Sequence, residues 1–171
     1  IVNHSCYFGA TNDNYSEFGK LDKHRVCGIK LFMGSSTGNM LVDKMNSLLN
    51  IFNGTDMLMP PTAKTRKPSR TILPSIRKMF AGENDIPIGK HPYIRSSAAC
   101  YASSELAVRL ARIAGARLHI LHVSTAKELQ LFNDYSLSEK HITAEACVAH
   151  LLFTLSDYRH VGHTYQVQSC H

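Results

Sequence analysis

Several common sequence features are absent from this chain of 171 residues. None of its five cysteines belongs to a C-x-x-C pair, and an odd number without metal-binding spacing favours reduced thiols and an intracellular setting. There is no signal-peptide pattern, no apolar run long enough to cross a membrane, no internal repeat and no low-complexity tract. These absences predict a cytoplasmic protein that does not associate with membranes.

The length suits one domain with a sizeable hydrophobic core. It falls short of the about 250 residues that a complete (β/α)₈ barrel typically requires. Apolar runs bounded by turn residues predict five strands. These strands are Ile1–Phe8, Gly28–Met33, Asp56–Met59, Arg117–Val123 and Ile142–Cys147.

The clearest amphipathic helix lies between Ser96 and Gly115. Ser96 or Ser97 can cap its start, and Gly115 is suited to end it. Because a strand follows at once, the pair resembles half of a repeating βα unit. The apolar stripe of this helix comprises Leu106, Leu110 and Ile113.

The most informative stretch is VCGIKLFMGSSTGNMLVD, residues Val26–Asp43, because its apolar strand contains a lysine. Side chains alternate along a strand, so one face carries Gly28, Lys30 and Phe32. Ile29, Leu31 and Met33 lie on the other face. A lysine there must reach solvent, find a partner or lose its charge, since an isolated buried ammonium is very costly. Carbamylation by carbon dioxide is one further option, which gives an anionic bridge for metals.

This stretch resembles the lysine strand of dihydroorotases, which are zinc enzymes of the amidohydrolase superfamily. Three other segments resemble the same family in the same order. Asn3–Asn14 is similar to its third barrel strand and the following loop, His91–Leu129 to a helix and the sixth strand, and His141–Phe153 to the seventh strand. The most specific matches are GIKLFMGSSTGNML and RLHILHVSTAKEL.

The resemblance implies an α/β fold that is a partial TIM-type (β/α)₈ barrel, roughly strands three to seven. Residues 1–171 would then be the central part of one barrel domain. The family binds two zinc ions per intact active site. By resemblance, Lys30 is the carbamylated lysine that bridges them and His122 is the ligand from strand six. The family's H-x-H motif on strand one and its aspartate on strand eight have no counterpart here, so the catalytic residue is unknown.

The alternation of residues places His122 on one strand face with Leu118 and Ile120. His122 is also at the carboxyl end of the predicted strand, where barrel enzymes place catalytic groups. His119 is on the opposite face, and we expect it to be structural and packed toward an outer helix.

Polar residues near these positions are candidates for a substrate pocket. The loop GSSTGN follows the lysine strand but lacks the spacing and lysine of a phosphate-binding P-loop. His150 lies where the family often has paired histidines, although Ala149 replaces the first of them. The candidate pocket residues are Ser35, Ser36, Thr37, Asn39 and His150.

The segment Met59–Ser75 departs from the family pattern, with four prolines and four basic residues where strand five should end. Met59 to Lys67 can be encoded so that reading two bases later gives A-T-H-C-E-D-E-E, which matches the family's metal-binding motif. Tyr165–His171, read one base later, can give T-R-C-N-P-A, close to another family segment. We therefore interpret 59–75 and 165–171 as frameshifted.

The formal net charge of +6 would ordinarily suggest an anionic partner. Four of the positive charges lie inside the suspect segment, and without them the net charge is +2. The four acidic residues of the alternate frame would lower it to −2. The sequence therefore does not predict nucleic-acid binding.

The leading hypothesis for function is dihydroorotase, the reversible hydrolysis of dihydroorotate to N-carbamoyl-aspartate in pyrimidine biosynthesis. Alternatives are another cyclic amidohydrolase, such as a hydantoinase or dihydropyrimidinase, and a non-catalytic degenerate fragment or assembly partner. The expected partner is the small-molecule substrate, and self-association into a homo-oligomer stays open. Expressed alone, the chain is expected to hold less than a full pair of zinc ions and to have negligible activity.

Sequencing the source DNA tests the frameshift interpretation. We expect insertions or deletions near Met59, between Arg70 and Ile76, and near Tyr165. An unbroken, independently confirmed reading frame that encodes the printed residues would contradict this interpretation.

Overall fold

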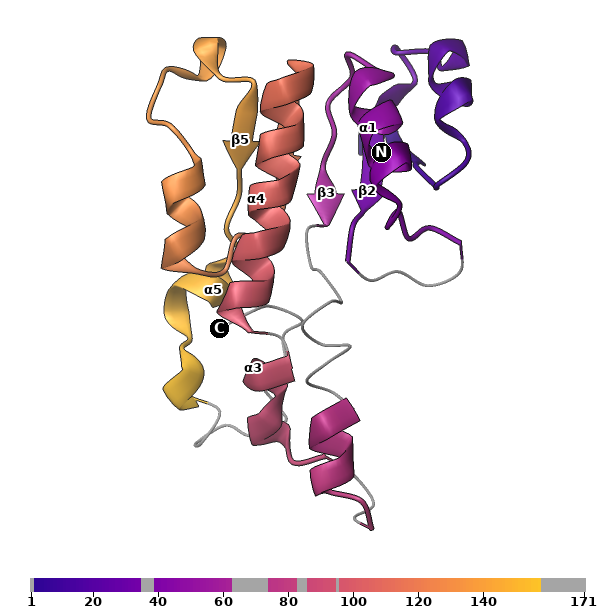
Figure 1. Cartoon of the computed structure of the whole chain (residues 1–171). Helices are drawn as coiled ribbons and strands as arrows, with labels where there is room; N and C mark the ends of the chain where they lie inside the picture. Colours follow the sequence, from indigo (N-terminus) through magenta and orange to yellow (C-terminus); the bar gives the residue numbers. More distant parts are fainter. Residues whose placement is uncertain (1, 35–38, 63–73, 83–85, 95, 158–171) are drawn as a thin grey trace.

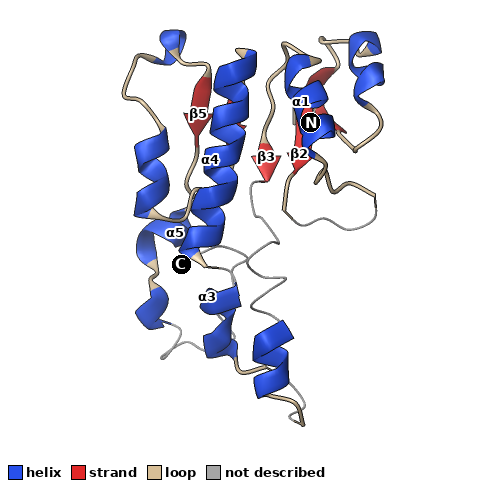
Figure 2. Cartoon of the chain, viewed as in Figure 1, coloured by secondary structure: helices blue, strands red, loops and turns tan. Residues whose placement is uncertain are grey.

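The computed structural model describes residues 2–34, 39–62, 74–82, 86–94 and 96–157 (Figure 1). Helices make up most of the regular structure, and the strands are short (Figure 2). The strands are β1 (Cys6–Gly9), β2 (Val26–Phe32), β3 (Pro61–Thr62), β4 (Leu118–Ile120) and β5 (Ile142–Ala144). The α-helices are α1 (Met45–Asn53), α3 (His91–Ile94), α4 (Ser97–Ala114) and α5 (Val148–Leu152), and residues 74–79 are also helical. Among the 3₁₀ helices are η1 (Tyr15–Lys20) and η3 (Ala126–Leu131).

All strand pairs in the described part of the chain are parallel. The order is β1-β2-β3 in one sheet and β4-β5 in another. A bridge between Met59 and Leu118 joins the two sheets, with the Met59 amide donating to the Arg117 carbonyl at 2.9 Å. Parallel strands require crossover connections, and this helix-rich chain supplies them.

Strands lie at or beside all five predicted positions, with one shift. Asp56–Met59 was expected as the third strand, but β3 lies a few residues later. The carbonyl oxygens of Leu58 and Pro60 accept hydrogen bonds from β2 amides at 2.9 and 3.5 Å. The Thr62 carbonyl accepts one at 3.2 Å from Met33, which directly follows β2. Proline has no N–H but keeps its carbonyl, so it can lie here as an acceptor. Residues 63–73 of the suspect segment lie outside the described residues.

The helices cover one face of the strands. Figure 1 shows α1 lying over β2, and α4 contacts both α1 and β4. Ile29 and Leu31 of β2 are fully buried in the same core as Phe52 of α1 and Val108 of α4. Burying such apolar side chains is the dominant favourable term in folding. The predicted alternation along the lysine strand is therefore confirmed for its helix-facing side.

The predicted helix between Ser96 and Gly115 is confirmed, including its ends. The Ser96 hydroxyl accepts a hydrogen bond from the Ala99 amide, which identifies Ser96 as the cap. Gly115 has a left-handed φ of 64°, the conformation that glycine adopts at helix ends with least strain. The predicted apolar stripe was wrong at Ile113, which is 70% exposed, because the buried face runs through Ala107 and Ala111 instead.

The described residues form an α/β unit with parallel strands, and they do not close into a barrel. No helix within the described ranges is long and apolar enough to span a membrane. Cys6, Cys27 and Cys147 are free thiols as expected, whereas Cys100 is disulfide-bonded, which corrects the expectation for that residue.

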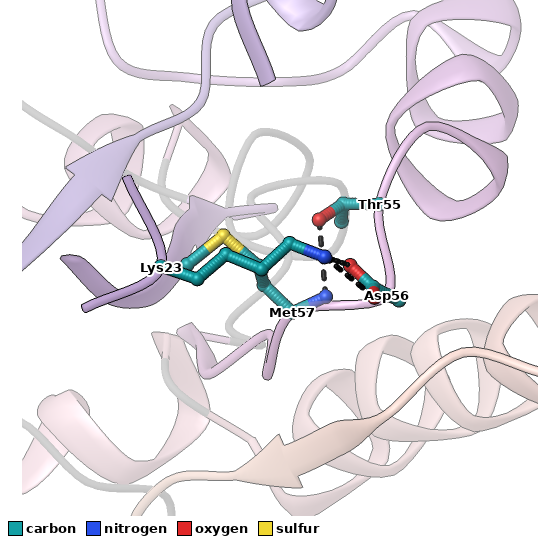
Figure 3. Close-up of polar contacts among 4 residues, drawn as sticks. All are labelled: Lys23, Thr55, Asp56 and Met57. Atoms are coloured by element: carbon teal, nitrogen blue, oxygen red, sulfur yellow. Dashed lines mark hydrogen bonds and ion pairs between the residues drawn. The ribbon is translucent and has the colours of Figure 1, made fainter. Parts of the chain in front are cut away.

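The Lys23 ammonium lies 2.7 Å from both carboxylate oxygens of Asp56 (Figure 3). Next to them, the Thr55 hydroxyl accepts a hydrogen bond from the Met57 amide. The hydrogen bond and charge of Lys23 lower the pKa of the Asp56 carboxyl. Lys23 precedes β2 and Asp56 precedes the segment paired with it, so this pair joins the amino ends of parallel strands.

Gly28 allows β2 and the segment before β3 to approach closely. A Cβ atom at this position would overlap the Leu58 carbonyl oxygen and would lie 3.2 Å from Cε1 of Tyr7. We predict that Gly28→Ala lowers the free energy of unfolding by about 1–3 kcal/mol, the range for overpacking. Urea denaturation of the full chain measures this change.

Gly19→Ala is the matched control, since a Cβ there meets no atom within 4 Å. The control should change the free energy of unfolding by less than about 0.5 kcal/mol. Equal stability of the two variants would contradict the role assigned to Gly28.

Candidate functional site

Lys30 lies in β2 on the face opposite the helix-packed residues Ile29 and Leu31. Its side chain is half-buried, and its Nζ atom lies 5.2 Å from the centre of the Phe32 ring. Burial lowers the pKa of the Lys30 ammonium below the ordinary lysine value, and the Glu145 carboxylate opposes part of this change. A lowered pKa increases the share of neutral amine, which is the form that can react with carbon dioxide.

His119 lies on the same side of the sheet, which corrects the expectation that it packs toward an outer helix. Leu118 and Ile120 are the buried neighbours that face the helices. The His119 Nδ1 atom is 2.8 Å from the Thr143 hydroxyl, and its Nε2 atom is 3.3 Å from the Glu145 carboxylate. The imidazole and the carboxylate form an ion pair when His119 is protonated.

Glu145 directly follows β5 and was not among the residues predicted from the sequence. Its charge acts on groups from three other strands: Tyr7 of β1, Lys30 of β2 and His119 of β4. Burial is the main cause that raises the pKa of the Tyr7 hydroxyl, and Cys27 and Glu145 add to it. The alternation around the paired residues His119 and Thr143 could have placed Glu145 on this face, because it is two residues beyond Thr143.

His122 lies past the end of β4, so strand alternation does not place it with Leu118 and Ile120, which corrects that prediction. Its φ is 44°, and it is the non-glycine residue with positive φ in the described part of the chain. Side chains rarely adopt this left-handed conformation without support from their surroundings. The backbone next to it is fixed, because the Val123 amide donates to the Glu145 carbonyl at 2.8 Å.

His150 lies in α5 near the same loop. Its Nδ1 atom is 3.3 Å from the Val123 carbonyl oxygen, so α5 contacts the residue that follows His122. His150 was a candidate for the substrate pocket, and the structure places it beside the loop at the carboxyl end of β4. That is the end of the strand where a barrel-type site is expected.

The loop after the lysine strand is seen only at its ends. Ser35, Ser36 and Thr37 lie outside the described residues, and Asn39 is exposed. Asn12, in the loop after β1, is hydrogen-bonded to residues that follow GSSTGN. Its side-chain amide donates to the Leu41 carbonyl at 3.1 Å, and its backbone carbonyl accepts from the Ser47 hydroxyl at 2.7 Å.

The described residues do not assemble a metal site by themselves. In ranges 2–34, 39–62, 74–82, 86–94 and 96–157, no group of three His, Cys, Asp or Glu side chains could hold a metal ion. Zinc usually takes three or four such ligands. Lys30 and His122 are therefore at most part of a ligand set.

Comparison with known proteins connects this arrangement to one group of solved structures. No protein-family model matches the chain, and no curated protein matches it by sequence. An L-hydantoinase (dihydropyrimidinase) from Arthrobacter aurescens matches 99% of the chain with a TM-score of 0.83 and 21% identity. A D-hydantoinase matches 88% with a TM-score of 0.68 and 22% identity. A dihydropyrimidinase from Brevibacillus agri matches 92% with a TM-score of 0.72 and 17% identity.

The chain has the fold of one part of these enzymes. It spans 38%, 32% and 34% of the lengths of the three solved structures. The TM-scores establish the shared fold, whereas identities of this size leave the activity of the chain to be tested.

We predict that Lys30 titrates at a lower pH than the ordinary value for a lysine side chain. Burial is the cause, because it disfavours the ammonium form of Lys30. Glu145→Gln should lower the pKa of Lys30 further, because the carboxylate favours the charged amine. NMR titration of reductively ¹³C-methylated lysines, assigned with Lys30→Arg, measures both changes.

The lowered pKa of Lys30 also makes the stability of the fold depend on pH. Folding favours the neutral amine, so Lys30 opposes folding below its folded-state pKa, and this penalty disappears as pH rises past the ordinary lysine value. Titration of Lys30 at or above the ordinary lysine value would contradict the effect of burial.

Proposed function

We propose that this chain is the central part of a cyclic amidohydrolase, an enzyme that hydrolyses an amide bond within a ring. The observation that carries the proposal is the likeness in fold to hydantoinases over nearly the whole chain. A second observation also supports it. Lys30, which the sequence motif indicates as the metal-bridging lysine, is half-buried on the sheet face away from the helices.

In this proposal, residues 1–171 supply roughly strands three to seven of one barrel domain. The remaining strands would belong to the complete protein. Segments 59–75 and 165–171 remain proposed frameshifts, and they lie mostly outside the described residues. Closure of the barrel would cover the open edges of β1 and β5, which otherwise expose unpaired backbone groups.

Lys30 and His122 are the proposed metal-binding residues, with zinc as the proposed metal. Lys30 would act as a carbamate, for which its lowered pKa is favourable. His122 would contribute its imidazole from the loop after β4. Since the described residues do not complete a zinc site, we assign no step of the reaction to a metal in this chain.

Different observations support different substrates. The names of the solved structures favour a hydantoin or a dihydropyrimidine. The motifs GIKLFMGSSTGNML and RLHILHVSTAKEL favour dihydroorotate. In each case water adds to a ring carbonyl, the carbon–nitrogen bond breaks and the nitrogen takes a proton.

Turnover by the complete protein tests the proposal. We expect hydrolysis of one of three compounds, dihydroorotate, hydantoin or dihydrouracil, by protein purified with bicarbonate and zinc. Lys30→Ala should reduce kcat/KM by more than about 100-fold, the upper range for removal of groups that only support metal ligands. His122→Asn should have a comparable effect.

Lys20→Ala is the control, because Lys20 is exposed and pairs with Glu17 at the surface. It should retain normal turnover. Full activity of Lys30→Ala would contradict the proposal, and absence of turnover on all three compounds would favour the non-catalytic alternative.

A further inference from the structure

Glu128 is a carboxylate buried in the loop region that follows β4. It lies in η3 and is only 3% exposed. A buried carboxylate is costly unless its oxygen atoms accept hydrogen bonds. The Ser104 hydroxyl donates to Oε1 at 2.6 Å, and the Thr125 hydroxyl donates to Oε2 at 2.8 Å. Both oxygens of Glu128 are therefore satisfied by groups from different parts of the chain.

These bonds join the loop to the long helix. Ser104 lies on α4 and is 1% exposed, so its hydroxyl is fixed within the core. The Ser124 amide also points to Oε2 of Glu128, at 3.4 Å. Through this carboxylate, the backbone two residues after His122 is held against α4. Bonds to a charged acceptor are stronger than neutral ones, so the connection is stiff.

These hydrogen bonds constrain the backbone next to His122. Its left-handed φ of 44° lies in a sparsely populated region, which persists only where the surroundings enforce it. On the sheet side, the Val123 amide is bound to the Glu145 carbonyl. On the helix side, Glu128 binds Ser124 and Thr125. Residues 122–125 are thus held from two directions.

We propose that Glu128 is a positioning residue that, with Ser104, holds His122 in its left-handed conformation at the carboxyl end of β4. The importance of Glu128 for catalysis rests on the proposed function, in which His122 binds metal. The effect of Glu128 on the backbone conformation of His122 is independent of that function. Glu128 itself faces Ser104 and Thr125 and acts through the loop.

NMR of the full chain, without metal or substrate, tests this proposal. We expect Glu128→Ala and Ser104→Ala to speed hydrogen exchange of the Val123 and Ser124 amides by about tenfold or more, as for loss of a hydrogen bond to a charged group. The coupling between the amide and α protons of His122, which depends on φ, should change in both variants. Glu128→Gln, which keeps an acceptor oxygen, should give an intermediate result.

Ser103→Ala is the matched control. Ser103 is a buried neighbour of Ser104 on α4, and its hydroxyl is not among the groups bound to Glu128. It should leave the His122 coupling unchanged. If Glu128→Ala does not fold, Ser104→Ala removes one hydroxyl and still provides the test.

Two results would overturn the proposal. One is an unchanged His122 coupling in both Glu128→Ala and Ser104→Ala. The other is an equal rise of exchange in α1 and in residues 122–125, since this would make Glu128 a general contributor to stability. Neither result depends on turnover, so failure of the enzyme proposal is measured separately.

Discussion

The parallel pairing of β2 with the segment that precedes and includes β3 is the interaction on which this structure depends. Three carbonyl oxygens of that segment accept hydrogen bonds, two from β2 and one from Met33 directly after it. The missing side chain of Gly28 lets the two backbones approach. The same segment continues to β4 through Met59. Without this pairing, the two small sheets would be separate, and Lys30 would not lie within the electrostatic influence of Glu145.

The two faces of the sheet have different surroundings, one apolar and buried, the other polar and partly exposed. One face carries Ile29, Leu31 and Leu118, which are buried against α1 and α4. The other face carries Lys30 and His119, which are partly exposed and interact electrostatically with Glu145. A strand whose side chains alternate between these two environments explains how a lysine can be kept in an otherwise apolar run. It also explains why burial changes the pKa of that lysine without an isolated charge in the core.

Much of this fold could be predicted from local sequence. The apolar run around Lys30 predicted β2, and Ser96 and Gly115 marked the ends of α4 because their chemistry suits caps. His119 was misplaced because alternation tells which residues share a face and not which face meets the helices. His122 was misplaced because β4 ends two residues earlier, and a left-handed residue is not predicted by strand periodicity. Glu145 could be placed on the Lys30 face by alternation from Thr143, whereas Glu128 acts across a long sequence separation that no local pattern reveals.

The central claim is that Lys30 is a reactive amine held on the open face of the sheet. The most direct measurement is the ¹³C NMR spectrum of the complete protein prepared with zinc and ¹³C-bicarbonate. The account predicts a carbamate carbon signal that is present in the wild type and absent in Lys30→Ala. A wild-type protein without this signal, with Lys30 remaining an unmodified amine, would contradict it.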